Sequence, residues 1–196
     1  DFINEEDSLL MEVMRIDDHS PDGKINPNLS RQRSMRKEVE AMREMFPNAK
    51  RFFMNAVTDL PTDEDHNYKN YYSSFQRTVR KHLLKLKDYK KNHPNKKMIF
   101  LVADETSGIY IETIVKNDEV AAGKPHLVFL DKRFINEFID SDLDYLILYC
   151  PYNHFNTIES HEPLPLLTIF DVKNMKNNKT IPLYDYDENK MVSSEK

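Results

Sequence analysis

The chain has 196 residues, a formal net charge of −5, 39% hydrophobic residues and 31% charged residues. Its single cysteine, Cys150, excludes an internal disulfide framework and favours a reducing, cytoplasmic setting. The sequence has only three glycines, and no apolar run approaches the ~20 residues that a membrane span requires. A glycine-rich phosphate-binding motif is therefore excluded, and we expect neither a nucleotide cofactor nor a membrane partner.

The amino-terminal part of the chain is predicted to contain two helices and a strand. Apolar residues recur at helical spacing over residues 5–16 and again over residues 33–46. The run over residues 51–57 predicts a strand that leads into an acidic loop.

The longest predicted element is a basic helix over residues 67–92, in which apolar residues from Tyr68 to Tyr89 share one face. Lys69–Lys97 contains ten lysines and arginines against one acid, so the rest of the chain has a net charge of −14. These charges complement the helix dipole, because acids precede the helix and lysines end it. Alternatively, clustered cations bind the phosphates of a nucleic acid. The candidate nucleic-acid-binding residues are Arg77, Arg80, Lys81, Lys87 and Lys91.

Two strands and a loop are predicted after this helix. Residues 98–103 form an apolar run that is typical of a strand buried on both faces. Residues 109–115 predict a second strand, paired with the first as a hairpin. Residues 117–125 are predicted to form a loop.

The next segment predicts a parallel crossover. Residues 127–130 and 145–150 predict strands, and the helix expected over residues 132–140 lies between them in a right-handed connection. Residues 166–170 predict a further strand. The sequence thus indicates a mixed α/β fold. Its central sheet of about five strands, with at least one parallel βαβ crossover, is preceded by two helices and the long basic helix.

We expect a single α/β domain over residues 1–173, since a chain of this length buries a substantial core without disulfides or metals. Residues 174–196 are rich in asparagine and lysine and then acidic, which is typical of a polar carboxyl-terminal arm or tail. The sequence does not indicate an oligomeric state.

Acidic residues follow or precede the predicted strands. Asp104 and Glu105 follow the first strand of the sheet, and Asp171 follows the last, with Lys173 two residues later. In metal-dependent nucleases, acids at such positions bind Mg²⁺ and a lysine orients the attacking water. With Asp144 as a further acid, this set resembles the restriction-endonuclease-like (PD-(D/E)xK) superfamily in outline. The resemblance implies catalytic roles for all five residues and Mg²⁺ binding by Asp104 and Asp171.

The composition of the chain offers a simpler explanation for the acid-x-Lys pattern of Asp171 and Lys173. The pattern acid-x-Lys occurs four times in the chain. With 33 acids and 19 lysines among 196 residues, about three such matches arise by chance. The order of elements also departs from the superfamily, because the crossover helix precedes the strand that carries Asp171. Residues 104–108 equally match an ordinary turn.

A second cluster follows the last crossover strand, where Cys150, His154, Glu159 and His161 have a spacing that matches no common zinc site. Cysteine–histidine catalysis requires a base within hydrogen-bond reach, which this spacing does not indicate. We therefore expect Cys150 to pack as a small buried hydrophobic side chain.

Charge separation without a specific catalytic motif predicts a cytoplasmic, non-catalytic protein that binds a macromolecule through its basic helix or its acidic body. The sequence leaves open whether the partner is a protein or a nucleic acid, and it identifies no cofactor. The alternative is a Mg²⁺-dependent nuclease or a degenerate nuclease-like protein, for which Mg²⁺ would be the cofactor.

Overall fold

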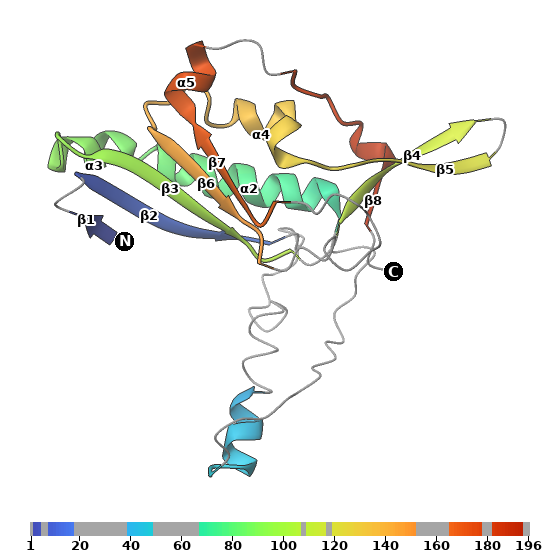
Figure 1. Ribbon diagram of the computed structural model, residues 1–196, viewed down its shortest axis with the longest axis horizontal. Coiled ribbons are helices and arrows are strands. Elements are labelled where there is room, and N and C mark those ends of the chain that lie inside the picture. The colour runs from blue at the N-terminus through green and yellow to red at the C-terminus, as the bar shows by residue number, and fades with distance from the viewer. Residues whose placement is uncertain are drawn as a thin grey trace.

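The computed structural model has a five-stranded main sheet with helices packed against one face and a three-stranded sheet beside it (Figure 1). This arrangement confirms the predicted mixed α/β class. The residues that the structure describes are 2–4, 8–17, 39–48, 67–106, 109–116, 119–151, 165–177 and 182–193.

The main sheet has the strand order β1-β2-β3-β6-β7. Its strands are β1 (Phe2–Asn4), β2 (Leu9–Ile16), β3 (Lys97–Asp104), β6 (Tyr145–Tyr149) and β7 (Leu167–Asp171). The three central strands β2, β3 and β6 are parallel neighbours, whereas β1 and β7 pair antiparallel at the two edges.

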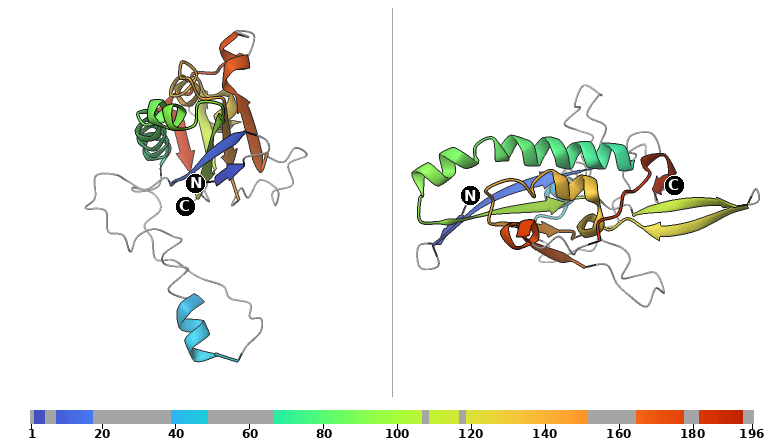
Figure 2. Two further views of the ribbon diagram at one scale, coloured as in Figure 1. Left: turned by 90° about the vertical axis from the view of Figure 1, so that its left-hand side faces the viewer. Right: turned by 90° about the horizontal axis from the view of Figure 1, so that it is seen from above.

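The predicted long helix is confirmed as two consecutive helices, α2 (Tyr68–Leu83) and α3 (Leu86–Asn92). The α2 helix begins where the side chain of Asn67 accepts a hydrogen bond from the amide of Asn70 at 2.9 Å. The α3 helix continues in nearly the same direction (Figure 2). Further short helices are η1 (Val128–Leu130), α4 (Lys132–Asn136) and α5 (Val172–Asn177).

The strand order explains why the helices cover one face of the main sheet. The chain adds β2, β3 and β6 in one direction without reversing. Parallel crossovers are almost always right-handed, so two crossovers in the same direction place their helices on the same face. The α2 and α4 helices accordingly pack against each other on that face (Figure 2).

The core lies between the helices and this face of the main sheet. Along β3, buried side chains alternate with less buried ones, as expected for a strand with one face in the core. Phe100 and Leu146 from the sheet are fully buried beneath Phe75 and Phe134 from the helices. The rings of Phe75 and Phe134 lie 4.7 Å apart, which fixes α2 against α4.

The opposite face of the main sheet is apolar, although no described helix packs on it (Figure 2). Val13, Leu167 and Ile169 are 36%, 49% and 60% exposed, respectively. The right-handed crossovers account for this arrangement of the described helices, because they place α2 and α4 on the other face.

The second sheet has the order β5-β4-β8 and contains β4 (Tyr110–Lys116), β5 (Glu119–Pro125) and β8 (Met191–Ser193). The hairpin of β4 and β5 projects from the main sheet (Figure 1). The segment after residue 173, predicted as a polar arm or tail, contains η3 (Glu188–Lys190) as well as β8, and its Tyr186 is buried. The domain boundary at residue 173 stays a prediction.

The prediction of a helix over residues 5–16 was wrong, because residues 9–16 form β2. Burial alternates along this strand, and all eight residues pair in register with β3. Pairing with a central strand outweighs the helical spacing of its apolar residues. Within the predicted helix over residues 33–46, the described residues 39–45 are helical. The predicted strand over residues 51–57 lies outside the described residues.

Three further local predictions were wrong. The strand that follows β3, β4, pairs with β5 and β8 and forms no hairpin with β3. Residues 119–125, predicted as part of a loop, form β5, and residues 128–130, predicted as strand, form η1. The parallel connections therefore join β2 to β3 and β3 to β6, so the crossover that ends at β6 begins at β3 and not at residues 127–130. The strands β6 and β7 confirm their predictions.

Candidate functional site

The predicted catalytic residues lie at two opposite ends of the main sheet. Asp104 is the last residue of β3 and pairs with Ile16 at the end of β2. Asp144 lies at the other end, where its carboxylate accepts a hydrogen bond from the amide of Met98 at 2.9 Å. Because a strand advances about 3.3 Å per residue, the two ends of β3 are about 20 Å apart.

Asp144, Asp171 and Lys173 meet in a shallow cleft at the amino end of β3. Lys173 Nζ lies 2.5 Å from Asp144 Oδ1, and Lys90 Nζ lies 3.3 Å from Asp144 Oδ2. Burial alone would raise the pKa of Asp144, but its hydrogen bonds, first of all that from Lys173, outweigh burial and lower the pKa. Two lysines thus already neutralise the Asp144 carboxylate.

The two predicted metal ligands are not brought together. Asp171 lies in the cleft with Asp144, whereas Asp104 lies at the far end of β3, and a shared Mg²⁺ requires ligand distances of about 2 Å. Glu105, next to Asp104, has its carboxylate 3.3 Å from Arg15. Among the described residues, no group of three or more His, Cys, Asp or Glu side chains is arranged to hold a metal ion.

Asp104 is only 3% exposed and accepts hydrogen bonds from four donors of the described residues. Its Oδ2 accepts a hydrogen bond from Tyr71 Oη at 2.6 Å and a weaker one from Cys150 Sγ at 3.7 Å. Its Oδ1 accepts hydrogen bonds from the amide and the hydroxyl of Thr106 at 3.0 and 2.7 Å. The carboxylate therefore fixes α2 and the turn after β3 to the end of the main sheet.

Cys150 packs against the core, as predicted. Burial, and then the charge of Asp104, raises the pKa of the Cys150 thiol, so the reactive thiolate does not form at neutral pH. The other residues of that cluster, His154, Glu159 and His161, lie outside the described part of the chain.

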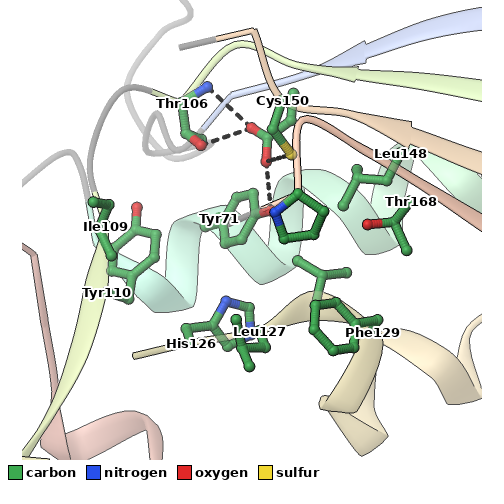
Figure 3. A pocket seen from close by; sticks show the side chains of 13 residues that line it. Tyr71, Thr106, Ile109, Tyr110, His126, Leu127, Phe129, Leu148, Cys150 and Thr168 are labelled. Atoms are coloured by element: carbon green, nitrogen blue, oxygen red, sulfur yellow. Dashed lines mark hydrogen bonds between the residues drawn. The ribbon is translucent and has the colours of Figure 1, made fainter. Parts of the chain in front are cut away.

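A cavity of about 70 Å³ lies beside Asp104, at the carboxyl ends of β3 and β6 (Figure 3). This is the edge at which open α/β sheets commonly bind ligands. The apolar walls come from several segments and include Ile109, Leu127, Phe129 and Leu148. Figure 3 shows His126 on the side of the cavity opposite Thr106 and Cys150.

His126 belongs to a second buried network, which begins behind the cavity wall. Its Nε2 lies 2.7 Å from Oδ2 of Asp131, and Tyr68 Oη donates to the same oxygen at 2.6 Å. The other oxygen of Asp131 accepts a hydrogen bond from the amide of Arg133 at 2.8 Å, which caps the start of α4. This network joins α2, α4 and the segment after β5 at one carboxylate.

The protonation of this pair follows from its surroundings. Burial would raise the pKa of Asp131, but hydrogen bonds from His126, Tyr68 and the Arg133 amide outweigh burial and lower it. Burial lowers the pKa of His126 more than Asp131 raises it, so the imidazole is neutral at pH 7. Because an ionised carboxylate only accepts, Nε2 carries the proton and Nδ1 has a free lone pair. An imidazole oriented in this way accepts a hydrogen bond or a proton.

The sequence analysis missed Tyr68, Tyr71, His126 and Asp131 as site residues. The position of Asp131 immediately before a helix was a usable signal, since Asp is a preferred N-cap residue. No local pattern indicated that Tyr68, 63 positions away in the chain, would reach the same carboxylate.

One of the predicted nucleic-acid-binding residues, Arg80, is occupied within the fold. Its Nε lies 2.6 Å from Oε2 of Glu137, whose Oε1 accepts hydrogen bonds from Tyr72 and Gln76 at 2.5 and 2.7 Å. Burial would raise the pKa of Glu137, but these hydrogen bonds, first that of Arg80, outweigh burial and lower it. Arg80 therefore fastens α2 to the segment after α4.

The other four predicted residues are exposed and, together with Lys85, make up the basic helix surface. We define this surface by Arg77, Lys81, Lys85, Lys87 and Lys91. None of the five forms an ion pair with another described residue. At about 3.6 residues per turn, they fall within one half of the helix circumference, opposite the buried core residues of α2 and α3. Asp88 is the one acid between them.

No protein-family model matches the chain, and no curated protein or solved structure matches it significantly. Every helix in the described ranges is too short or too polar to span a membrane.

Proposed function

We propose that this protein binds nucleic acid without catalysis, by contacting the phosphate backbone through the basic helix surface. The observation that supports the proposal is the set of five exposed cations on one helical face, none of them paired with another described residue. From residue 77 to residue 91 the surface extends about 21 Å, at ~1.5 Å per helical residue. That length matches about six base pairs of a duplex, at ~3.4 Å per pair.

The composition of the surface favours a nucleic acid over a protein partner. Four of its five cations are lysines, and lysine is depleted in protein–protein interfaces, where aromatic residues and arginine are enriched. Leu84 is the one large apolar side chain exposed along this part of the helix. Lysine point charges without aromatic anchors suit phosphates, which release counterions when they are neutralised. The single cysteine remains the basis for expecting a cytoplasmic setting.

The positions of the predicted catalytic residues do not support the alternative of a Mg²⁺-dependent nuclease. Lys173 and Lys90 pair with Asp144, and Asp171 lies in the same cleft, but the other two predicted acids, Asp104 and Glu105, lie about 20 Å away, at ~3.3 Å per strand residue. Asp104 is buried and already accepts hydrogen bonds from Tyr71 and Thr106, which Mg²⁺ would have to displace.

Fluorescence anisotropy with a labelled 20-base-pair duplex, over a series of salt concentrations, tests the proposal. Five phosphate contacts predict a slope of log K against log salt of about −4.5, since each contact contributes about −0.9. Affinity should then fall about 500-fold between 50 and 200 mM salt. Replacing Arg77, Lys81 and Lys87 by glutamine should reduce the magnitude of the slope to about 1.8, because two contacts remain.

A matched triple variant controls for net charge alone. Lys116, Lys132 and Lys176 are exposed lysines outside α2 and α3, and their replacement by glutamine removes the same three charges. This control should keep the wild-type slope. Equal slopes for the two triple variants, or no duplex binding at 50 mM salt, would contradict the proposal and favour a protein partner.

A further inference from the structure

The cavity beside Asp104 contains a polar atom that no described residue pairs with, Nδ1 of His126. The side chain of His126 is only 3% exposed, and its other ring nitrogen donates to Asp131. A polar atom at the wall of a cavity is paired by ordered water or by a ligand when no protein group reaches it. A group inside the cavity would supply that partner.

The Asp104 carboxylate and the Tyr71 hydroxyl, two further polar groups of the cavity, are already engaged. Both oxygens of Asp104 accept hydrogen bonds from the surrounding protein, and Tyr71 donates its hydroxyl hydrogen to one of them. Among the described residues that line the cavity there is no lysine or arginine, so none of them would balance an anionic ligand. The rest of the wall is mainly apolar, which suits an uncharged ligand.

The fold holds the acceptor in a fixed orientation. Asp131 fixes the proton of the His126 ring on Nε2 and is itself held by Tyr68 and by the start of α4. Rings of Tyr68 and Phe134 pack against the imidazole at centroid distances of 5.0 and 5.3 Å. The lone pair of Nδ1 is therefore preorganised, which lowers the cost of binding a donor.

We propose that this cavity binds a small, uncharged, largely apolar molecule whose N–H or O–H group donates a hydrogen bond to Nδ1 of His126. The volume of about 70 Å³ is several times the ~10–15 Å³ that one water requires, so the cavity admits a larger group than water. The site is separate from the basic helix surface and does not depend on nucleic-acid binding.

Pyrazole and 1-methylpyrazole are suitable probes, because they share a compact ring and differ in the N–H donor. Each is titrated into ¹⁵N-labelled protein while amide and histidine ring signals are followed by NMR. Pyrazole should shift the His126 Nδ1 signal and the amides of cavity residues, and bind about tenfold more tightly than 1-methylpyrazole, as one added hydrogen bond implies. Equal affinities, or a proton found on Nδ1 in the free protein, would overturn the proposal.

Two variants test separately the hydrogen-bond acceptor Nδ1 and the free space of the cavity. His126→Phe should abolish the preference for pyrazole, because the ring then offers no acceptor. Phe129→Trp adds bulk to the cavity wall and leaves the His126–Asp131 contact in place, so it should weaken both probes by at least tenfold while Nε2 keeps its proton. If His126→Phe fails to fold, Phe129→Trp still decides the question, and unchanged pyrazole binding to it would refute the site.

Discussion

Replacing Asp104 by asparagine should destabilise the protein by about 3 kcal/mol, because its carboxylate accepts hydrogen bonds from three strong donor groups and one thiol. Hydrogen bonds to a charged acceptor contribute about 1.5–3 kcal/mol each, against about 1 kcal/mol for a neutral acceptor. Asparagine would also point an amide N–H₂ group toward either Tyr71 or Thr106, both of which are donors in the native arrangement. One buried donor would then lose its acceptor.

Tyr71→Phe provides the matched comparison. It removes one donor and leaves the Asp104 carboxylate with the others, so it should cost about 2 kcal/mol, less than Asp104→Asn. Urea unfolding followed by circular dichroism measures both, and an unchanged m value ensures that the unfolding free energies are comparable. A neutral or stabilising effect of Asp104→Asn would refute this structural role and indicate instead a carboxylate held under strain for function.

Two further predictions concern His126 and Phe134, whose buried rings pack against each other. Because burial lowers the pKa of His126, its ring signals should titrate in NMR with a midpoint below ~6.5, the usual value for histidine. As the pH falls, His126 is protonated in the unfolded chain before it is protonated in the folded protein. The free energy of unfolding should therefore fall as the pH drops from about 6.5 toward the midpoint of the folded protein. A midpoint above ~6.5 would contradict the neutral state assigned to the imidazole. Phe134→Ala should cost about 3–5 kcal/mol in urea unfolding, since this fully buried ring contacts Phe75 and His126. A loss below ~1 kcal/mol would indicate that the core around α4 is loosely packed.

Regular apolar patterns made part of the fold predictable. The long helix and the strands β3, β6 and β7 each carry the periodicity or the apolar run expected of them, and each was found. The β2 strand shows the limit of this approach, because its alternation is interrupted by Glu12, which is buried. The Oε1 atom of Glu12 lies 2.9 Å from Nδ1 of His82 on α2, a contact that local sequence does not reveal. The β5 strand is mostly exposed and has no apolar alternation, so only its pairing with β4 defines it.

The candidate sites were predictable to different degrees. Charge density along the chain indicated the basic helix surface, but the ion pair of Arg80 with Glu137 depends on a contact between distant segments. The carboxylates at strand ends were easy to single out, yet which end each occupies depends on strand direction and register. Asp104 and Asp171 both lie at the carboxyl ends of their strands, and they are separated because β7 runs antiparallel to the central strands.

The most direct test of nucleic-acid binding by the basic helix surface is the salt dependence of duplex affinity, compared between the two triple variants. We expect a slope of about −4.5 for the wild type and for the Lys116, Lys132 and Lys176 control. We expect about −1.8 for the variant that lacks Arg77, Lys81 and Lys87. A wild-type affinity that does not change with salt, or equal slopes for both variants, would contradict the claim that this helical face binds phosphates.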